Sequence, residues 1–241
     1  MIITSKANPL IKKIVALGEK KFRKEYGEYL IEGVKPVNEC RDTGCEITCV
    51  VCSESLSASY PDAIVVSDEL FCRISSEKSP QGVLAIVKLP DTGVTKPNGC
   101  CLLLDRLQDP GNLGTIIRTA NAAGYEDLYL INCADAFSPK TVRASMSGIF
   151  HVRIHEGTYD EIFNALDGVP LICADMSGDN VFEFKSPENF CLCIGNEGGG
   201  LSRIVRDKAD YTIKIPMRST CESLNAGVSA AIAMYALKNN R

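Results

Sequence analysis

The sequence predicts an α/β protein made of two domains, and three observations support this prediction. Short apolar runs alternate with segments of helical periodicity along most of the chain. Residues 89–99 contain two prolines and two glycines without an apolar period, which is typical of a linker. The chain has 241 residues, of which 45% are hydrophobic and 23% charged, so it can bury the cores of two ordinary domains. We therefore expect a small α/β domain over residues 1–95 and a larger domain with a mostly parallel sheet over residues 98–241.

The first domain is expected to begin with a helix at Asn8 and Pro9, because asparagine caps helices and proline fits their first turn. Gly44 marks the end of a second helix. The apolar runs predict, in order, a strand at 29–31, a helix at 34–41, strands at 47–52 and 63–66, a helix at 68–74 and a strand at 83–87.

The second domain alternates strands and helices more densely, which predicts a mostly parallel sheet covered on both faces. The predicted strands lie at 101–104, 128–132, 151–155, 171–174, 191–194 and 211–215. The predicted helices lie at 113–123, 139–146, 159–166 and 202–209, and a polar loop at 218–222 leads to a final helix.

The stretch 215–237 joins the last strand to the final helix. Pro216 cannot donate to a sheet ladder and so ends the strand. Ser223 is expected to cap the helix, and the small residues at 226–233 keep that helix thin enough for close approach of a ligand or of other backbone. Ser223 and Asn225 thus lie where the carboxyl end of a strand meets the amino end of a helix, which is where ligands bind in open α/β sheets.

Two further loops at strand ends are polar and rich in glycine. The first, residues 105–118, carries Asn112 and Arg118, and the second, residues 194–201, has four glycines around Glu197. Neither contains the Lys-Ser/Thr of a P-loop or the G-x-G-x-x-G of a dinucleotide fold. Each loop alone is equally well explained as an ordinary tight turn, whereas the three together indicate one binding site.

Basic residues are concentrated at the amino-terminal end. Residues 1–24 carry seven basic groups and one acid, a net charge of +6, whereas the remainder of the chain carries −10. A basic end on an acidic body is typical of an arm that contacts phosphate, and a solvated helix face is the alternative interpretation. The first residues lack the apolar run of a signal peptide and no stretch reaches membrane-spanning length, so we expect a cytoplasmic protein with no membrane partner.

The twelve cysteines lie mostly in apolar, strand-like runs, where a reduced thiol acts as a small hydrophobe. The spacing of Cys45, Cys49 and Cys52 matches the cluster-binding loop of radical S-adenosylmethionine enzymes, so an iron–sulfur protein is a low-ranking alternative. A strand at 47–52 argues against it, because residues three apart on a strand point to opposite faces. His151 and His155 share a face of a predicted strand, but strand residues with satisfied hydrogen bonds are a better interpretation than a metal pair. We predict no metal site.

Three motifs in the second domain resemble a known family. The pattern N-x-G-x-x-x-R at 112–118, G-x-E-x-x-G at 195–200 and I-P-M…S-L-N at 215–225 is similar, in order, to the three motifs of the SpoU (TrmH) RNA 2′-O-ribose methyltransferases of the SPOUT superfamily. VRASMSG at 142–148 fits as well, and the amino-terminal third resembles that family's substrate-binding domain. The resemblance implies S-adenosyl-L-methionine (AdoMet) as methyl donor, a homodimer, a C-terminal trefoil knot and an RNA substrate, with ribosomal RNA favoured over transfer RNA.

The resemblance also implies a role for each matching residue. The residues that match backbone-type AdoMet contacts are Gly195, Ile215 and Leu224. The residue that matches the group activating the ribose hydroxyl is Arg118, and the polar residues that complete the site are Asn112, Glu197, Ser223 and Asn225. Because arginine effectively never gives up its proton, we expect Arg118 to act at least partly as a cation that holds a phosphate and stabilises the developing alkoxide.

Two other classes of function stay open from the sequence. A binding module could keep the fold without catalysis, although the intact polar motif residues argue against it. A related transferase could methylate a base nitrogen, although S-L-N together with N-x-G-x-x-x-R favours ribose.

Overall fold

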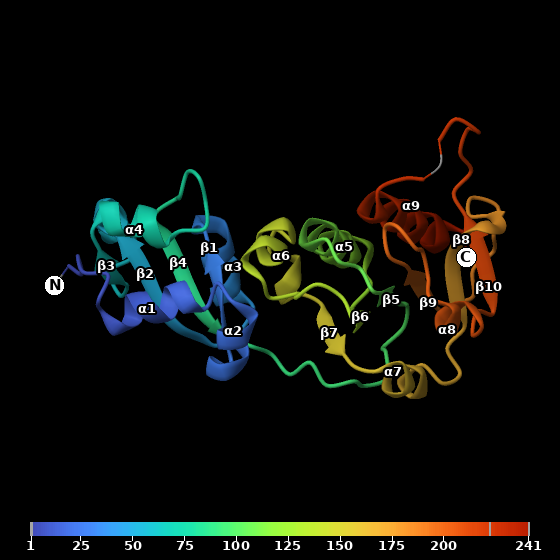
Figure 1. Ribbon diagram of the computed structural model, residues 1–241, viewed down its shortest axis with the longest axis horizontal. Coiled ribbons are helices and arrows are strands. Elements are labelled where there is room, and N and C mark those ends of the chain that lie inside the picture. Colours follow the sequence, from blue (N-terminus) through green and yellow to red (C-terminus); the bar gives the residue numbers. More distant parts are fainter. Residues whose placement is uncertain (1, 222, 241) are drawn as a thin grey trace. The chain divides into compact units, whose positions relative to one another are not determined.

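The structure is a computed structural model that describes residues 2–221 and 223–240, so residue 222 of the predicted polar loop lies outside the described part. The chain forms two compact units (Figure 1). The first contains residues 2–90 together with Phe137–Phe150, and the second contains Asp91–Ala136 and the chain from His151 onward. No helix or strand lies between Lys88 and Cys101, as expected of the linker.

The segment Phe137–Phe150 differs from the expected division, because the sequence assigns it to the larger domain whereas it packs with the first unit. Its helix α6 (Pro139–Ala144) lies against strand β1 (Glu28–Glu32). The rings of Phe137 and Tyr29 pack 5.1 Å apart. The segment lies in the chain between two strands of the second unit. The burial of these aromatic rings explains why it packs with the first unit instead.

The first unit is a four-stranded mixed sheet in the order β1-β4-β2-β3. Its other elements are α1 (Pro9–Ala16), α2 (Lys20–Tyr26), α3 (Val34–Asp42), β2 (Ile47–Ser53), η1 (Glu54–Ser59), β3 (Ile64–Val66), α4 (Asp68–Ile74) and β4 (Val83–Lys88). The Asn8 side chain accepts a hydrogen bond from the N–H of Leu10, which confirms the predicted start of α1. Helix α2 was not predicted because its sequence has no apolar stripe; instead, its buried Arg23 donates to the carbonyl of Leu17 at 2.7 Å.

The second unit is a six-stranded sheet in the order β10-β8-β9-β5-β6-β7, and every neighbouring pair is parallel. Its elements are β5 (Cys101–Asp105), α5 (Pro110–Ala123), β6 (Asp127–Ile131), β7 (Arg153–Glu156), α7 (Tyr159–Ala165), β8 (Leu171–Asn180), β9 (Cys191–Ile194), α8 (Arg203–Arg206), β10 (Tyr211–Lys214) and α9 (Ala226–Asn239). Helices α5 and α9 pack together on one side of the sheet, and α7 and α8 lie on the other (Figure 1). The predicted parallel sheet covered on both faces is confirmed.

Several predicted boundaries differ from the structure; helix α6 ends at Ala144 and α8 at Arg206, both earlier than predicted. Ser223 does not cap the final helix; Asn225 does, because its side-chain oxygen accepts from the N–H groups of Gly227 and Val228. Helix α5 begins at Pro110 rather than at 113, because the Asp109 side chain caps it. Strand β7 begins after His151, so this histidine does not share a strand face with His155.

Strand β8 continues well beyond the predicted residue 174, but it does not pair evenly with β10. The register shifts between Thr212 and Ile213, whose partners are Cys173 and Asp179, so residues 174–178 loop out. A Cβ at Gly178 would lie within 2.5 Å of backbone atoms of Thr212 and Ile213, which explains the glycine. The loop that results borders the candidate site described below.

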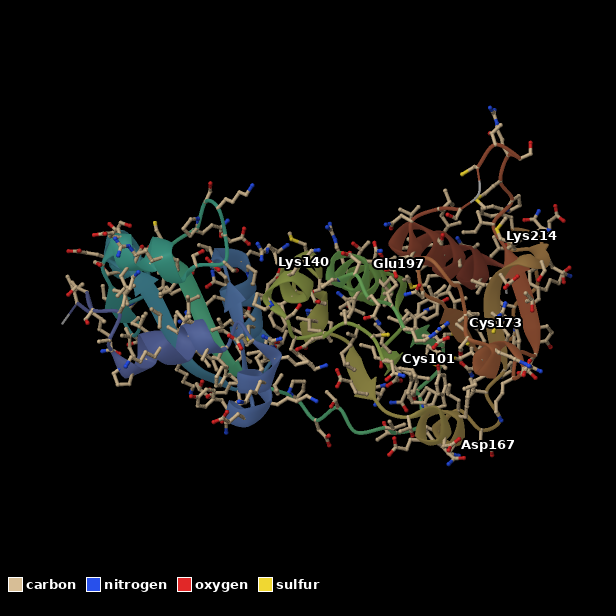
Figure 2. All side chains as sticks on the ribbon, viewed as in Figure 1. Cys101, Lys140, Asp167, Cys173, Glu197 and Lys214 are labelled. Carbon is tan, nitrogen blue, oxygen red and sulfur yellow. The ribbon has the colours of Figure 1, made fainter. Side chains whose placement is uncertain are left out.

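All twelve cysteines are free thiols within the described part of the chain, and seven are buried. Four of these, Cys101, Cys173, Cys191 and Cys193, belong to the core between the parallel sheet and α7 and α8; Figure 2 labels Cys101 and Cys173. Cys49 and Cys52 lie on β2, as predicted. Over residues 2–221 and 223–240, no group of three or more His, Cys, Asp or Glu side chains could hold a metal ion. A helix long and apolar enough to cross a membrane is also absent from those residues.

Candidate functional site

A cavity of about 280 Å³ lies in the second unit, between the ends of β9 and β10, the looped-out part of β8 and the start of α9. The predicted site residues that line it are Gly195, Glu197, Ile215, Ser223 and Leu224. Asp175, Met176, Lys214 and Met217 line it as well, and the sequence had given no site role to any of them. Their position at strand ends was the available signal. Figure 2 labels Glu197 and Lys214. The cavity combines apolar walls with a few charged groups, as small-molecule sites do.

The glycine-rich loop, residues 195–200, forms one wall of this cavity. It closes on itself, because the N–H of Asn196 donates to the carbonyl of Gly200 at 3.1 Å and the N–H of Gly200 donates back at 2.9 Å. A Cβ at Gly195 would lie within 2.5 Å of three backbone atoms, two of Gly200 and one of Leu201. The backbone therefore turns so tightly that only glycine fits at 195.

The three motif loops meet in a chain of side-chain hydrogen bonds. Asn225 donates through Nδ2 to Oδ1 of Asn112 at 2.8 Å, and Asn112 donates through Nδ2 to Oε1 of Glu197 at 3.0 Å. The direction is set at one end, because Oδ1 of Asn225 accepts from the N–H groups that begin α9 and leaves its NH₂ for Asn112. Residues from 112, 197 and 225, distant in sequence, thus form one connected group.

Glu197 ends this chain as a carboxylate. Burial acts to raise its pKa, but hydrogen bonds from the Asn112 side chain and from the backbone N–H groups of Glu197, Asp109 and Gln108 outweigh it, so its pKa is lowered. The side chain is therefore ionised at neutral pH, and it holds the Asn112 amide in a single orientation.

Arg118, the residue predicted to activate the ribose hydroxyl, neither joins this hydrogen-bonded group nor lines the cavity. It lies six residues after Asn112 on α5, which places it about 120° around the helix at roughly 100° per residue. Its side chain is exposed and makes no hydrogen bond or ion pair with any residue that the structure describes. Among the described residues it is thus an unpaired cation at the surface.

Asp105, to which the sequence gave no role, supports the glycine-rich loop through buried hydrogen bonds. It is fully buried at the end of β5, where Oδ2 accepts from the N–H of Ser202 at 2.6 Å and Oδ1 accepts from the hydroxyl of Tyr159 at 2.7 Å. These bonds tie the end of β5 to the chain that leaves the glycine-rich loop. A buried carboxylate needs such partners, so the apolar run that precedes Asp105 was the signal that could have found it.

Comparison with known proteins gives a consistent result. The model of the SpoU rRNA Methylase family matches residues 99–235, and the model of the MRM3-like substrate binding domain matches residues 8–85. The 23S rRNA (guanosine(2553)-2'-O)-methyltransferase RlmP of Bacillus subtilis is 32% identical over 98% of both chains. The 23S rRNA (uridine(2479)-2'-O)-methyltransferase of Streptomyces viridochromogenes is 30% identical over 91% of this chain and 85% of that one.

Solved structures agree with these relatives. An AdoMet-bound rRNA methyltransferase from Sinorhizobium meliloti superposes with a TM-score of 0.89 at 28% identity, over 99% of this chain and 97% of that one. The SpoU methyltransferase AviRb from Streptomyces viridochromogenes, in complex with AdoMet, superposes with a TM-score of 0.86 at 28% identity, over 96% of this chain and 98% of that one.

Proposed function

The chain belongs to the SpoU rRNA methylase family, and on this premise we propose that it transfers a methyl group from AdoMet to a ribose 2′-hydroxyl of ribosomal RNA. The observation that carries the proposal is the cavity, one wall of which is the glycine-rich loop. Glu197 of that wall is hydrogen-bonded to Asn112 of the first motif, and Asn112 is hydrogen-bonded to Asn225 of the third. Two of the similar solved structures bind AdoMet.

The residues around the cavity fit AdoMet chemically. Ile215 and Leu224 offer apolar surface for an adenine ring, and the Gly195 turn exposes backbone groups that can bind its polar edge. Asp175 and Lys214 supply charges of both signs, as the amino and carboxylate groups of the donor require. When bound, AdoMet supplies an electrophilic methyl carbon on a sulfonium.

The polar chain then serves to position the reacting groups. Glu197 and Asn225 hold the Asn112 amide from both sides, so this amide keeps one orientation while substrate binds. Ser223 adds a hydroxyl to the wall of the cavity. Fixed dipoles of this kind need no reorganisation when charge develops on the ribose oxygen.

Arg118 would act as the cation of the reaction. A free-base guanidine at neutral pH would cost several kcal/mol, at about 1.4 kcal/mol per pKa unit. A role that keeps the proton, in which Arg118 binds a substrate phosphate and stabilises the alkoxide, is therefore favoured. It is exposed and has no partner among residues 2–221 and 223–240, which leaves it available to RNA or to a second subunit.

We also propose a homodimer and a C-terminal trefoil knot, as the family resemblance implies. The knot would involve the region where the backbones of β8 and β10 approach so closely at Gly178. Light scattering on the purified protein tests the dimer directly, and a monomeric mass at micromolar concentration would contradict it.

The amino-terminal unit would bind the RNA. It matches a substrate-binding domain, and Lys12, Lys20, Lys21 and Lys24 of its first two helices are exposed. Contacts of lysine with phosphate release counterions, so we expect affinity to fall steeply as salt rises. A location in the cytoplasm would follow from a ribosomal substrate.

Ribose-methylation mapping tests the proposed function. Total RNA from cells that lack the protein is incubated with AdoMet and the purified wild type, with Arg118→Ala as the matched control. We expect one new 2′-O-methyl group in ribosomal RNA with the wild type and a strongly reduced yield with the variant. A new mark in transfer RNA would move the substrate to that class, and a methylated base nitrogen would contradict the ribose chemistry. Measurable AdoMet binding without any new mark would indicate a binding module.

A further inference from the structure

Arg106, the residue directly after β5, contacts the glycine-rich loop at two points. Its guanidinium Nη2 donates to the carbonyl of Gly200 at 3.2 Å, and its own carbonyl accepts from Nδ2 of Asn196 at 2.8 Å. One residue from another part of the sheet thus holds both ends of the loop. Between these two points lies Glu197, which contacts Asn112.

From this geometry we infer that Arg106 is a positioning residue for the proposed methyl transfer: it fixes the glycine-rich loop in the shape that walls the AdoMet cavity. The inference rests on the proposed function for its ligand, although the contacts themselves are independent of any ligand. Arg106 does not line the cavity, so it acts through the loop and is no catalytic residue.

Arg106 is itself held firmly enough to act as an anchor. Its N–H donates to the carbonyl of Ile131 at 2.8 Å, and its Nε lies 3.4 Å from the buried carboxylate of Asp105. Its carbonyl also accepts from Nε2 of Gln108, which bonds in turn to the carbonyl of Asn132 at 2.7 Å. These contacts tie Arg106 to the ends of two neighbouring strands, β5 and β6.

The backbone of Arg106 adopts a conformation that few side chains favour. Its φ is +60°, in the left-handed region. Such strain persists only where surrounding contacts over-determine it, and it concentrates at functional sites. At Arg106 the strained conformation aims the carbonyl at Asn196 while the guanidinium reaches Gly200.

The glycine-rich loop is tightly packed, so we expect it to shift if the contact with Arg106 is lost. Gly195 abuts the backbone of Gly200 and Leu201, and Gly195, Asn196, Glu197 and Gly200 all line the cavity. Without the guanidinium, the Gly200 carbonyl keeps the N–H of Asn196 as a donor but loses its tie to β5. We expect the cavity wall to loosen as a result, and Glu197 to move away from Asn112. Loss of the Arg106 side chain should therefore weaken AdoMet binding and leave RNA binding unchanged.

The test compares Arg106→Asn with Arg106→Lys. Asparagine tolerates the left-handed conformation but removes the guanidinium, whereas lysine keeps a cationic donor. The matched control is Arg203→Asn, because Arg203 is 85% exposed and pairs only with Asp207 among the described residues. Calorimetry with AdoMet alone, filter binding of RNA and steady-state kinetics are measured for each, and the fold is checked by thermal unfolding.

We expect Arg106→Asn to weaken AdoMet binding by about tenfold, the effect of losing one hydrogen bond from a charged donor. Its KM for AdoMet should rise in parallel with RNA affinity unchanged, Arg106→Lys should recover part of the loss, and the control should match the wild type. Unchanged AdoMet affinity would overturn the inference. Lost RNA affinity with intact AdoMet binding would overturn it too, because Arg106 would then be an RNA contact.

Hydrogen exchange of the ligand-free protein gives a second readout. The N–H of Asn196 donates to the carbonyl of Gly200, the same acceptor that the Arg106 guanidinium holds, and the N–H of Gly200 donates back to Asn196. We expect faster exchange at residues 196–200 in Arg106→Asn and, if that variant fails to fold, in Arg106→Lys to a smaller degree. Unchanged exchange would overturn the inference. Failure of the proposed function gives a different result. The wild-type protein would then not bind AdoMet, although hydrogen exchange of its glycine-rich loop would still depend on Arg106.

Discussion

The substitution Gly195→Ala is the sharpest test of the site. A Cβ at this position would lie within 2.5 Å of the carbonyl group of Gly200 and the nitrogen of Leu201, whereas ordinary contacts begin at 3.4 Å, so the loop would have to open by about 1 Å. All three obstructing atoms are backbone, so no side chain can rotate away. The φ of Gly195 is not in the left-handed region, so the effect is steric and owes nothing to backbone preference.

The size of the effect follows from overpacking. Inserting one carbon into a site that cannot yield costs about 1–3 kcal/mol, which corresponds to a loss of about 5- to 150-fold in an equilibrium constant. The loop lies at the surface of the unit and walls the cavity, so it can open outward without unfolding the sheet. We therefore expect the cost to appear mainly as weaker AdoMet binding and only slightly in thermal stability.

The matched control is Gly199→Ala in the same loop. A Cβ there meets nothing within 4 Å, and the φ of Gly199 is not in the left-handed region. Calorimetric titration with AdoMet and the midpoint of thermal unfolding are measured for both variants and the wild type. The reasoning is refuted if Gly195→Ala binds AdoMet as tightly as Gly199→Ala does.

Three further predictions concern other parts of the second unit. Asn112→Ala removes the partner of the Glu197 carboxylate and should lower kcat by about tenfold, for the loss of one charge-assisted hydrogen bond; single-turnover kinetics that match the wild type would contradict it. Arg118→Lys should retain partial activity if a fixed cation suffices, and complete loss with RNA binding intact would count against a role for charge alone. Asp127→Asn should cost about 2 kcal/mol of unfolding free energy at pH 7, below the value for a fully buried pair because the Arg153 side chain is 45% exposed. Burial acts to raise the pKa of Asp127, but hydrogen bonds, led by that from Arg153, lower it, so its stabilisation is present above about pH 4 and is lost as pH falls further. The stability difference between wild type and Asp127→Asn should therefore shrink in urea titrations toward acid pH, and a constant difference would contradict this assignment.

Much of the fold followed from local patterns. The helix start at Asn8 was predictable because side chain and backbone of adjacent residues decide it. The parallel sheet was predictable because its strands, buried on both faces, read as continuous apolar runs such as Cys101–Asp105. Helix α2 was not, since its stability comes from a buried arginine bonded to the preceding turn and not from an apolar stripe.

The candidate site was predictable by residue type but not by arrangement. Motif spacing indicated Asn112, Glu197 and Asn225, yet it gave neither the order of their hydrogen bonds nor the fact that Asn225, in place of Ser223, caps α9. The spacing of the motifs also did not indicate that Arg118 lies apart from these three hydrogen-bonded side chains. That difference depends on which side of α5 faces the glycine-rich loop, which is a property of packing.

Periodicity and motif composition are written along the chain, so the layered α/β architecture and the family could be predicted from it, together with the residues that we propose carry the chemistry. Tertiary structure alone decided that Phe137–Phe150 packs with the first unit, that residues 174–178 loop out beside the cavity, and that Asp105 and Arg106 hold the glycine-rich loop. The physical reason is the same in each case. These features arise where segments distant in sequence compete for the same contacts, and the outcome depends on distances that no local pattern encodes.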